Sequence, residues 1–384
     1  MFAQRTNWNL AANRLSETLA AHRRAEKPLL DLTVSNPTEC GFQYDQAAIV
    51  SALQNPAALK YEPNPRGLEL AREAVRQYYA DRGGAVSIDD IFLTTSTSEA
   101  YGYAFRTLCD PHDQVLIPEP SYPLFEFLAD LQDVRLVRYP LVYDHGWQID
   151  LHALERAITA RTRAIIVVNP NNPTGNFCKA REMQELDEIC SSRGMAIITD
   201  EVFYDFSLSD QRPSCPASTE ALTFTLSGLS KISGLPQMKV AWAIVNGPEP
   251  LKSQAQARFE VIADTYLSMN APVQWALPSL LALRHGFQGQ LLTRVRANLA
   301  DLDRQLDKHN SVSRLELEAG WNAVLRVPAT RSDEEFALEL LSAKGVYAHP
   351  GHFYDFPGDG YFVVSLITPQ RDFATGIERM LSML

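Results

Sequence analysis

The sequence predicts an α/β fold, with a large domain built on a mostly parallel β-sheet flanked by helices and a smaller α+β domain after it. Short apolar runs that alternate with helix-like segments indicate the large domain. The runs are continuously apolar, as is typical of parallel strands that are covered on both faces. The expected strands are Ile91–Thr95, Val115–Pro118, Ala164–Asn169, Ala196–Thr199, Leu222–Leu226 and Val240–Val245.

Helical periodicity lies between these runs. Leu151–Ala160 and Lys179–Arg193 have apolar residues at helical spacing, which predicts amphipathic crossover helices. After about Ala271 the alternation stops, and this change predicts the second, smaller domain. Its expected elements are a long helical stretch from Val273 to His309, a strand Ala323–Val327, a helix Asp333–Lys344 and a strand Phe362–Ile367.

The composition excludes several classes of partner. The chain has 384 residues, of which 46% are hydrophobic, enough to bury sizeable cores. Its formal net charge of -11 disfavours nucleic acid and anionic lipid, because both repel an acidic surface. No apolar run approaches the roughly 18 residues of a membrane-spanning helix. The start, MFAQRTNWNL, lacks the basic and apolar regions of a secretion signal.

The cysteine pattern predicts reduced thiols and therefore a cytoplasmic protein. The cysteines are odd in number, scattered and without a CxxC pair: Cys40, Cys109, Cys178, Cys190 and Cys215. His349 and His352 lie close together in the sequence, but no third ligand is evident beside them. We therefore expect no metal site.

Polar residues follow the expected strands at their carboxyl ends, which is where ligands bind in an open parallel sheet. After the first strand comes the segment Ser96–Ser98, at the start of an expected helix. Such a segment offers a phosphate hydroxyl groups, free backbone N–H groups and the positive end of the helix dipole. A simple helix N-cap is the alternative at this position.

The following strand ends lead to an asparagine, an acid and a lysine. NPNNPTG (Asn169–Gly175) is a turn fixed by proline and glycine that would present Asn172 rigidly. Asp200 ends a buried strand, where an acid needs a cationic partner unless it serves only as a helix cap. Lys231 lies in an apolar, Gly/Ser-rich stretch, where desolvation would depress its pKa and make it a Schiff-base amine. A solvated loop lysine is the alternative, but the coincidence of these signals at successive strand ends favours one shared site.

Three motifs carry a family resemblance: NPNNPTG (Asn169–Gly175), DEVFYDF (Asp200–Phe206) and SGLSKISGLPQMK (Ser227–Lys239). With these motifs in this order, the chain resembles the class I/II aminotransferases of pyridoxal 5′-phosphate (PLP) fold type I, the aspartate aminotransferase superfamily, from about residue 30 to the C-terminus. The resemblance implies a seven-stranded sheet. It also implies a large PLP-binding domain over 41–275, and a small domain formed by the N-terminal segment 1–40 together with 276–384.

The resemblance also implies roles for single residues. Lys231 would form a Schiff base with PLP and move a proton between substrate and cofactor, Asp200 would pair with the pyridine nitrogen, and Tyr122 would stack on the ring. Asn172 would donate a hydrogen bond to the phenolic oxygen. Tyr61 would reach the phosphate bound by a neighbouring subunit, which implies a homodimer with shared active sites. The residues expected to bind the cofactor are Thr97, Ser98, Tyr122, Asn172, Asp200, Ser227, Ser230, Lys231, Lys239 and Tyr61.

Three departures from the family pattern concern the cofactor. Lys239 stands where an arginine usually binds the phosphate, so charge is retained but bidentate geometry is lost. Gly228 replaces a frequent phosphate-binding serine, for which Ser227 or Ser230 would substitute. Phe203 replaces a tyrosine that donates to the phenolic oxygen, which should raise the pKa of the Schiff base unless Tyr204 or a water molecule compensates.

The fourth departure concerns the substrate. Val363 stands where the family normally has an arginine that clamps the substrate α-carboxylate with two hydrogen bonds. Arg66, Arg326 and Arg371 are the candidates to replace it. We expect an aminotransferase that moves an amino group from an amino acid or amine to a 2-oxo acid in ping-pong half-reactions. A PLP-dependent lyase or decarboxylase on the same fold is the alternative, because a changed carboxylate environment changes which bond at Cα is broken.

Overall fold

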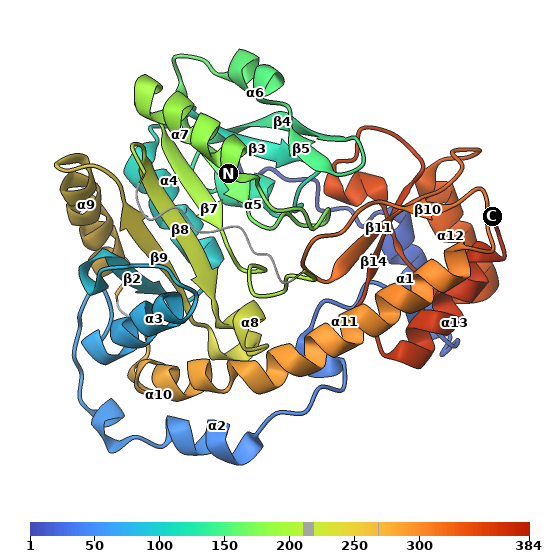
Figure 1. Cartoon of the computed structure of the whole chain (residues 1–384), viewed down its shortest axis with the longest axis horizontal. Helices are drawn as coiled ribbons and strands as arrows, with labels where there is room; N and C mark the ends of the chain where they lie inside the picture. Colours follow the sequence, from blue (N-terminus) through green and yellow to red (C-terminus); the bar gives the residue numbers. More distant parts are fainter. Residues whose placement is uncertain (210–218, 268) are drawn as a thin grey trace.

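A large β-sheet forms the centre of the molecule in the computed structural model, which describes residues 1–209, 219–267 and 269–384. Eight strands lie side by side in the order β2-β9-β8-β7-β6-β3-β4-β5 (Figure 1). Their bounds are β2 (Ile91–Thr94), β9 (Ala241–Asn246), β8 (Leu222–Gly228), β7 (Ala196–Asp200), β6 (Thr162–Val168), β3 (Gln114–Glu119), β4 (Arg135–Tyr143) and β5 (Trp147–Ile149).

The sheet is mostly parallel, as predicted. The pairs β7–β8, β6–β7, β3–β6 and β3–β4 are parallel, while β9 runs antiparallel to both β8 and β2. The six strands expected from apolar runs coincide with β2, β3, β6, β7, β8 and β9 within two residues at each end. The expected count of seven is wrong by one, because β5 extends the edge of the sheet antiparallel to β4. The sequence of β4 mixes polar and apolar residues, so the search for continuous apolar runs missed it.

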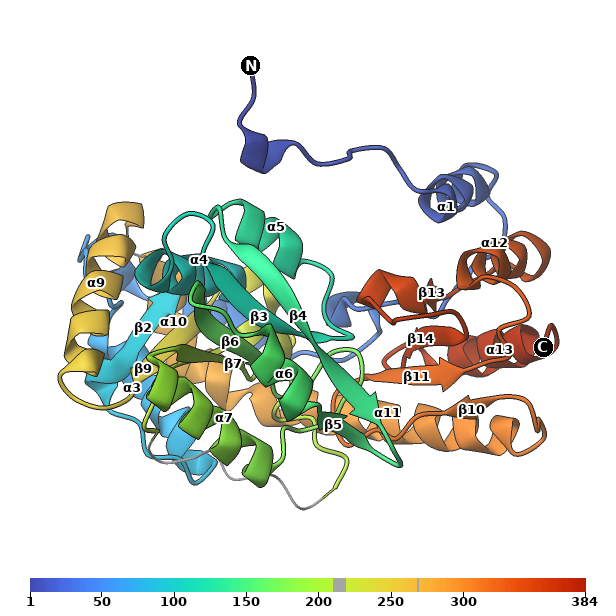
Figure 2. The same ribbon diagram turned by 90° about the horizontal axis from the view of Figure 1, so that it is seen from above.

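Helices cover the sheet on both faces (Figures 1 and 2). On one face α4, α5 and α9 pack on a core that includes Phe92, Phe224 and Phe259, and on the other face α6 and α7 pack on a core that includes Ile165 and Ile197. Their bounds are α4 (Thr97–Leu108), α5 (Phe125–Asp130), α6 (Leu151–Ala157), α7 (Ala180–Arg193) and α9 (Leu251–Tyr266). A third core joins the β2 and β9 end of the sheet to α3 (Glu69–Asp81), α8 (Leu229–Ile232) and α10 (Ala271–Ala282), and α2 (Gln46–Leu53) packs on α10.

The smaller unit has its own sheet and core. Its sheet has the order β10-β11-β14-β13, formed by β10 (Ser313–Arg314), β11 (Asn322–Arg326), β14 (Tyr361–Ser365) and β13 (His349–Pro350). One face of this sheet packs on α11 (Arg284–Leu306), α12 (Asp333–Lys344) and α13 (Gln370–Leu381). The N-terminal segment joins this unit: α1 (Arg14–Arg24) packs on α12, and β1 (Leu30–Asp31) pairs with β12 (Val346–Tyr347).

The long helical stretch expected from Val273 to His309 is two helices, α10 and α11, separated at Leu283. The two helices contribute to different cores: Leu277 of α10 lies in the third core of the large unit, and Phe287 of α11 lies in the core of the small unit. We therefore place the division between the units near Arg284, a few residues after the expected 276.

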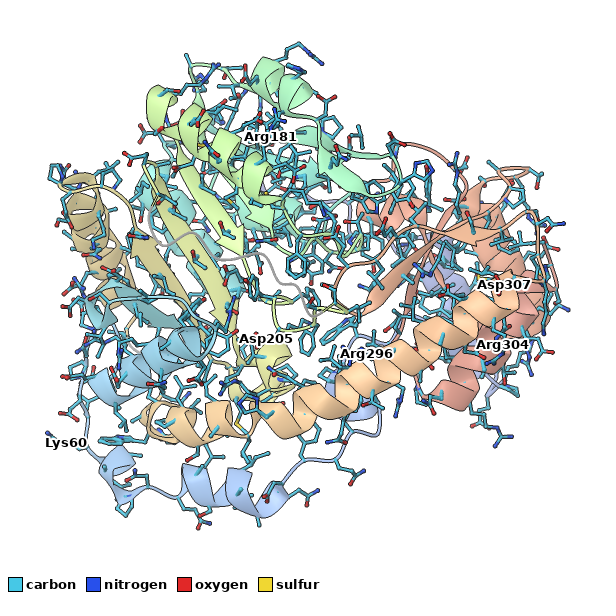
Figure 3. The ribbon with its side chains drawn as sticks, in the orientation of Figure 1. Lys60, Arg181, Asp205, Arg296, Arg304 and Asp307 are labelled. Atoms are coloured by element: carbon cyan, nitrogen blue, oxygen red, sulfur yellow. The ribbon has the colours of Figure 1, made fainter. Side chains whose placement is uncertain are left out.

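Side chains and backbone groups connect the two units. Ala319 N, just before β11, donates to Gly175 O after β6 (2.8 Å). Asp205 accepts a hydrogen bond from Gln288 Nε2 of α11 (2.8 Å), and Figure 3 shows Asp205 between the large sheet and this helix. Among the helices of the described part of the chain, none is long and apolar enough to cross a membrane. The cysteines at 40, 109, 178 and 190 are free thiols, and Cys215 lies outside the described residues.

Candidate active site

Lys231 lies in α8, the single helical turn that follows β8. Its Nζ lies 4.8 Å from the ring centroid of Trp321 and 5.6 Å from that of Phe203. Burial lowers the pKa of the Lys231 ammonium to about 8, and the nearby Asp200 carboxylate opposes part of this decrease. A lysine with this pKa has a substantial neutral fraction near neutral pH, so its amine is fit to act as a nucleophile.

Asp200 ends β7 in the buried interior next to Lys231. Burial raises the pKa of its carboxyl group to about 6, while hydrogen bonds from Val202 N and Tyr101 Oη, each 3.0 Å long, limit the increase. The sequence did not identify Tyr101 as a site residue. Tyr101 falls on the buried face of α4 among Ala100 and Ala104, so its pattern is that of any core aromatic residue.

The start of α4 forms the expected phosphate end of the site. Ser96 caps the helix by accepting a hydrogen bond from Glu99 N (3.1 Å), which leaves the backbone N–H groups at the first helical positions directed outward. Thr97 is half-buried and Ser98 is exposed. Ser96 is therefore the helix N-cap, and phosphate binding by Thr97 and Ser98 stays a prediction. Glu99 also accepts hydrogen bonds from Thr95 N and Oγ1, a local contact that the sequence did not suggest.

Lys239 lies at the same edge of the sheet as the start of α4. Ala241 pairs with Thr94, the last residue of β2, so the preceding Lys239 lies beside the turn that leads into α4. Lys239 is exposed and its φ is 53°. The lysine ammonium is therefore available to a phosphate at this helix start, although a lysine offers only a point charge.

The structure explains why position 228 is a glycine, and it places the Ser227 side chain away from the expected phosphate site. A Cβ on Gly228 would lie 2.8 Å from both Ala241 Cβ and Val240 O, so a serine does not fit. Ser227 is fully buried and directs its hydroxyl to Glu201 O (3.5 Å), on the side of the sheet opposite α4. The expectation that Ser227 replaces the missing serine is therefore wrong on this geometry. Ser230 lies half-buried in α8 beside Lys231 and stays a candidate.

Asn172 is held by a residue of the small unit. Asn322 Nδ2 donates a hydrogen bond to Asn172 Oδ1 (2.8 Å). Because the carbonyl end of Asn172 accepts this bond, its amide Nδ2 is the end that can donate to a ligand oxygen. The sequence missed Asn322, since an asparagine at the start of a strand carries no signal of its own.

Tyr122 and Phe203 differ in the group that each could present to the cofactor. Tyr122 is 40% exposed and packs edge-on against Phe125 at 6.3 Å, so one face of its ring is available for stacking. Phe203 packs edge-on against Trp321 at 4.8 Å. Tyr204 does not take the place of the missing hydroxyl, because its ring lies 3.8 Å from the Arg82 guanidinium and packs beside Phe177.

Val363 lies buried in β14, on the sheet face directed toward the large unit. Of the three arginines considered as its replacement, Arg66 pairs with Glu260 of α9 and Arg371 is exposed at the start of α13. Arg326 is a diagonal neighbour of Val363 on the same face of the sheet, but it is exposed at the end of β11 opposite to Asn322, the residue that contacts Asn172. Tyr61 is 74% exposed on the segment before α3.

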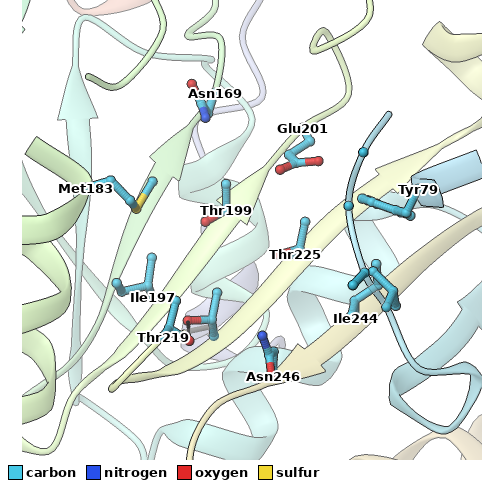
Figure 4. Close-up of a pocket in the computed structure, with 15 residues that line it drawn as sticks. Tyr79, Asn169, Met183, Ile197, Thr199, Glu201, Thr219, Thr225, Ile244 and Asn246 are labelled. Carbon is cyan, nitrogen blue, oxygen red and sulfur yellow. Dashed lines mark hydrogen bonds between the residues drawn. The ribbon is translucent and has the colours of Figure 1, made fainter. Parts of the chain in front are cut away.

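The cavity drawn in Figure 4 is not this site. It is lined by Thr199, Glu201, Thr225 and Asn246 on the sheet face opposite α4, and it does not include Lys231 or Asp200. Glu201 is engaged in a buried ion pair with Arg82 (3.0 Å).

The residues present fit PLP in chemical type and in order along the sheet edge. A helix start and Lys239 suit a phosphate, Lys231 supplies an amine of lowered pKa, and the buried Asp200 carboxyl suits a ring nitrogen that carries a proton. Asn172, fixed by Asn322, suits a phenolic oxygen.

Comparison with known proteins agrees with this assignment. The model of the family "Aminotransferase class I and II" matches residues 27–371. The chain is similar to the glutamate-pyruvate aminotransferase AlaA of Haemophilus influenzae, with 27% identity over 92% of this chain and 91% of that protein. It is also 27% identical to the alanine aminotransferase of Mycobacterium bovis, over 92% of this chain and 84% of that protein.

Solved structures share the whole fold. An aminotransferase from Escherichia coli superposes with a TM-score of 0.88 and 24% identity over 100% of this chain and 98% of that one. The alanine aminotransferase of Pyrococcus furiosus gives 0.89 and 21% identity, over 100% and 99% of the two chains. The family match spans nearly all of the sequence, and the chain therefore belongs to the class I and II aminotransferases, which are PLP-dependent enzymes.

Proposed function

We propose that this aminotransferase transfers the amino group of an amino acid to a 2-oxo acid at the site formed by Lys231, Asp200 and Asn172. The observation that carries the proposal is the Lys231 amine, whose pKa burial lowers to about 8 while Asp200 lies beside it. An amine of this pKa both gives up and takes back a proton near neutral pH, as the two half-reactions require. PLP supplies the electron sink for the bonds at the substrate Cα.

The surrounding residues hold this chemistry in place. Tyr101 Oη and Val202 N keep the Asp200 carboxylate in one orientation, so that it can hold a proton on a ring nitrogen. Asn172 is oriented by Asn322, and the rings of Trp321 and Phe203 exclude water from the Lys231 amine. Water exclusion preserves the lowered pKa that the amine needs.

For the substrate pair, we propose alanine or glutamate as donor with pyruvate or 2-oxoglutarate as acceptor. The relatives in Haemophilus influenzae and Mycobacterium bovis carry the names glutamate-pyruvate and alanine aminotransferase, which supports this choice. The same names favour transamination over the lyase or decarboxylase alternative.

We further propose a homodimer in which Tyr61 reaches the phosphate end of the neighbouring site. The exposure of Tyr61 (74%) and of the preceding Leu59 (91%) supports a partner at this surface. The free thiols support our proposal that the enzyme works in the cytoplasm.

Absorbance spectroscopy of the purified protein with PLP tests the function. We expect a band from the Lys231-bound cofactor that disappears on borohydride treatment and is absent in Lys231→Ala. Adding alanine or glutamate should convert the cofactor to its amino form, and pyruvate or 2-oxoglutarate should reverse the change. Conversion by no member of an amino-donor panel, or release of CO2 or ammonia without the amino form, would contradict transamination.

A further inference from the structure

The position of Val363 is flanked by two neutral polar side chains on the same face of the small sheet. In the order β11-β14-β13, His349 of β13 is paired directly with Val363. On the other side, Asn322 of β11 is paired with Ser365, two residues along β14 from Val363. Directly opposed residues have Cβ atoms about 5 Å apart and diagonal ones about 7–8 Å apart. Both side chains therefore border the space that an arginine at 363 would use.

Each of these two side chains uses one N–H or ring nitrogen in a hydrogen bond to a neighbouring residue and has a second one that could bind a ligand. Asn322 uses an amide N–H on Asn172 Oδ1, and the amide nitrogen carries a second N–H. His349 Nδ1 lies 3.2 Å from Tyr354 Oη, and this is the partner of His349 among the described hydrogen bonds. Its Nε2, on the other side of the ring, is left for a ligand.

His349 and Tyr354 also lie next to the expected cofactor. Ser121 N donates to Tyr354 O (2.9 Å), which places the turn that carries Tyr354 against the residue before Tyr122. The Tyr122 phenol lies close enough to Tyr354 to contribute to the raised pKa of the Tyr354 phenol, of which burial is the larger cause. His349 and Tyr354 therefore lie near Tyr122, the residue whose ring is expected to stack on the cofactor.

We propose that Asn322 and His349 bind the substrate α-carboxylate from the two sides of Val363, as neutral donors in place of an arginine. The proposal rests on the proposed function, and it names the substrate class of the site as α-amino acids and 2-oxo acids rather than simple amines. Two donors on the strands that flank β14, one on each side of it, can contact the two oxygens of one carboxylate, as the two nitrogens of an arginine would.

The groups around His349 keep its imidazole neutral before a ligand binds. Burial lowers the pKa of His349 to about 4, and the Asp31 carboxylate of β1 opposes part of the decrease. The other titratable groups that face it are the phenols of Tyr347 and Tyr354, and Arg23 lies 3.6 Å from Asp31. At neutral pH the His349 imidazole is therefore uncharged and can offer a carboxylate a hydrogen bond.

Calorimetric titration of the PLP-loaded enzyme with the unreactive pair propanoate and propanamide tests the proposal. We expect His349→Phe to raise the Kd of propanoate by about 10-fold or more, the change that loss of a hydrogen bond to a charged group produces, and to leave the Kd of propanamide unchanged. His349→Asn, which keeps a donor, should recover part of the affinity. His352→Phe, on an exposed histidine of the same loop, should behave like the wild type. The half-reaction with alanine should show the same order in KM.

An unchanged propanoate Kd in folded His349→Phe would overturn the proposal, as would an equal loss for propanoate and propanamide. If His349→Phe does not fold, His349→Asn and Asn322→Ala provide the same comparison. A wild type that converts alanine but does not prefer propanoate over propanamide would overturn this inference alone. A wild type that gives no half-reaction with any amino donor would instead overturn the proposed function.

Discussion

Tyr101 Oη donates a hydrogen bond to Asp200 Oδ2 across 3.0 Å in the interior of the large unit. Because this bond stabilises the ionised carboxylate, Tyr101→Phe should raise the pKa of Asp200 further above about 6. A larger fraction of Asp200 would then be protonated at neutral pH and unable to hold a proton on the cofactor ring. We expect kcat/KM to fall by about 2- to 4-fold at pH 7, and its acidic limb to move to higher pH by about 1 unit.

Tyr139→Phe is the matched control, because Tyr139 is equally buried and donates to Ile166 O (2.7 Å) away from Asp200. Both substitutions should cost about 1–2 kcal/mol of unfolding free energy. A pH profile of kcat/KM separates them, since only Tyr101→Phe should shift the acidic limb. A shift of equal size in Tyr139→Phe would show that the effect is one of general stability.

The lowered pKa of Lys231 predicts how fast the protein without cofactor captures PLP. The neutral amine is the reactive form, and its fraction rises about tenfold per pH unit until pH about 8, then levels off. The capture rate, followed by absorbance in stopped flow, should have the same shape. Asp200→Asn removes the carboxylate that stabilises the ammonium, so its plateau should begin at lower pH. A rate that still rises tenfold per unit above pH 9 would mean that Lys231 is not desolvated.

The bond between Asn322 and Asn172 predicts a coupled effect on the bound cofactor. A donor to the phenolic oxygen lowers the pH at which the visible band of the cofactor titrates, so Asn172→Leu should raise this midpoint by about 1 unit. Asn322→Leu should raise it by a smaller amount, because Asn172 is then free to turn its carbonyl toward the oxygen. In a double-mutant cycle the second substitution should add nothing to the first. Additive shifts would show that Asn322 acts independently of Asn172.

Gly228 allows a test of why this chain departs from its family. A Cβ there would overlap Ala241 Cβ and Val240 O, so Gly228→Ser should lower the free energy of unfolding by about 1–3 kcal/mol. Adding Ala241→Gly should restore part of the loss, since it removes the overlap with Ala241 Cβ and leaves those with backbone atoms. Denaturant unfolding of the three proteins measures both effects. A Gly228→Ser protein as stable as the wild type would contradict the packing account.

The sequence predicted the parts of the fold that depend on local pattern. The buried strands could be predicted because parallel strands covered on both faces are continuously apolar. The site residues Lys231, Asp200 and Asn172 could be predicted because they follow such strands. β4 was missed because it mixes polar residues with apolar ones near the edge of the sheet. The division between α10 and α11 was missed because both are helical, and the two helices differ only in the core on which they pack.

The parts of the site that the sequence missed come from contacts between distant segments. The sequence pattern indicates only that Tyr101 is a core residue of α4. It indicates only that Trp321 and Asn322 lie at the start of a strand in the small unit. Their roles follow from the proximity of Asp200, Lys231 and Asn172, which no local pattern encodes. The prediction that Ser227 binds the phosphate is wrong because side chains alternate along β8, and this alternation places the Ser227 side chain on the opposite face of the sheet.

The proposed sharing of Tyr61 between subunits predicts complementation between two damaged chains. Tyr61→Phe alone should weaken PLP binding by about 10-fold through loss of a hydrogen bond to the phosphate, and Lys231→Ala alone should abolish the covalent cofactor band. A heterodimer of the two has one site that combines Lys231 from one chain with Tyr61 from the other, and this site should bind PLP with wild-type affinity. If Tyr61 instead served its own subunit, every site with Lys231 would lack the hydroxyl. Absorbance titration of differently tagged, co-purified chains measures the difference, and no restored affinity in the purified heterodimer would contradict sharing.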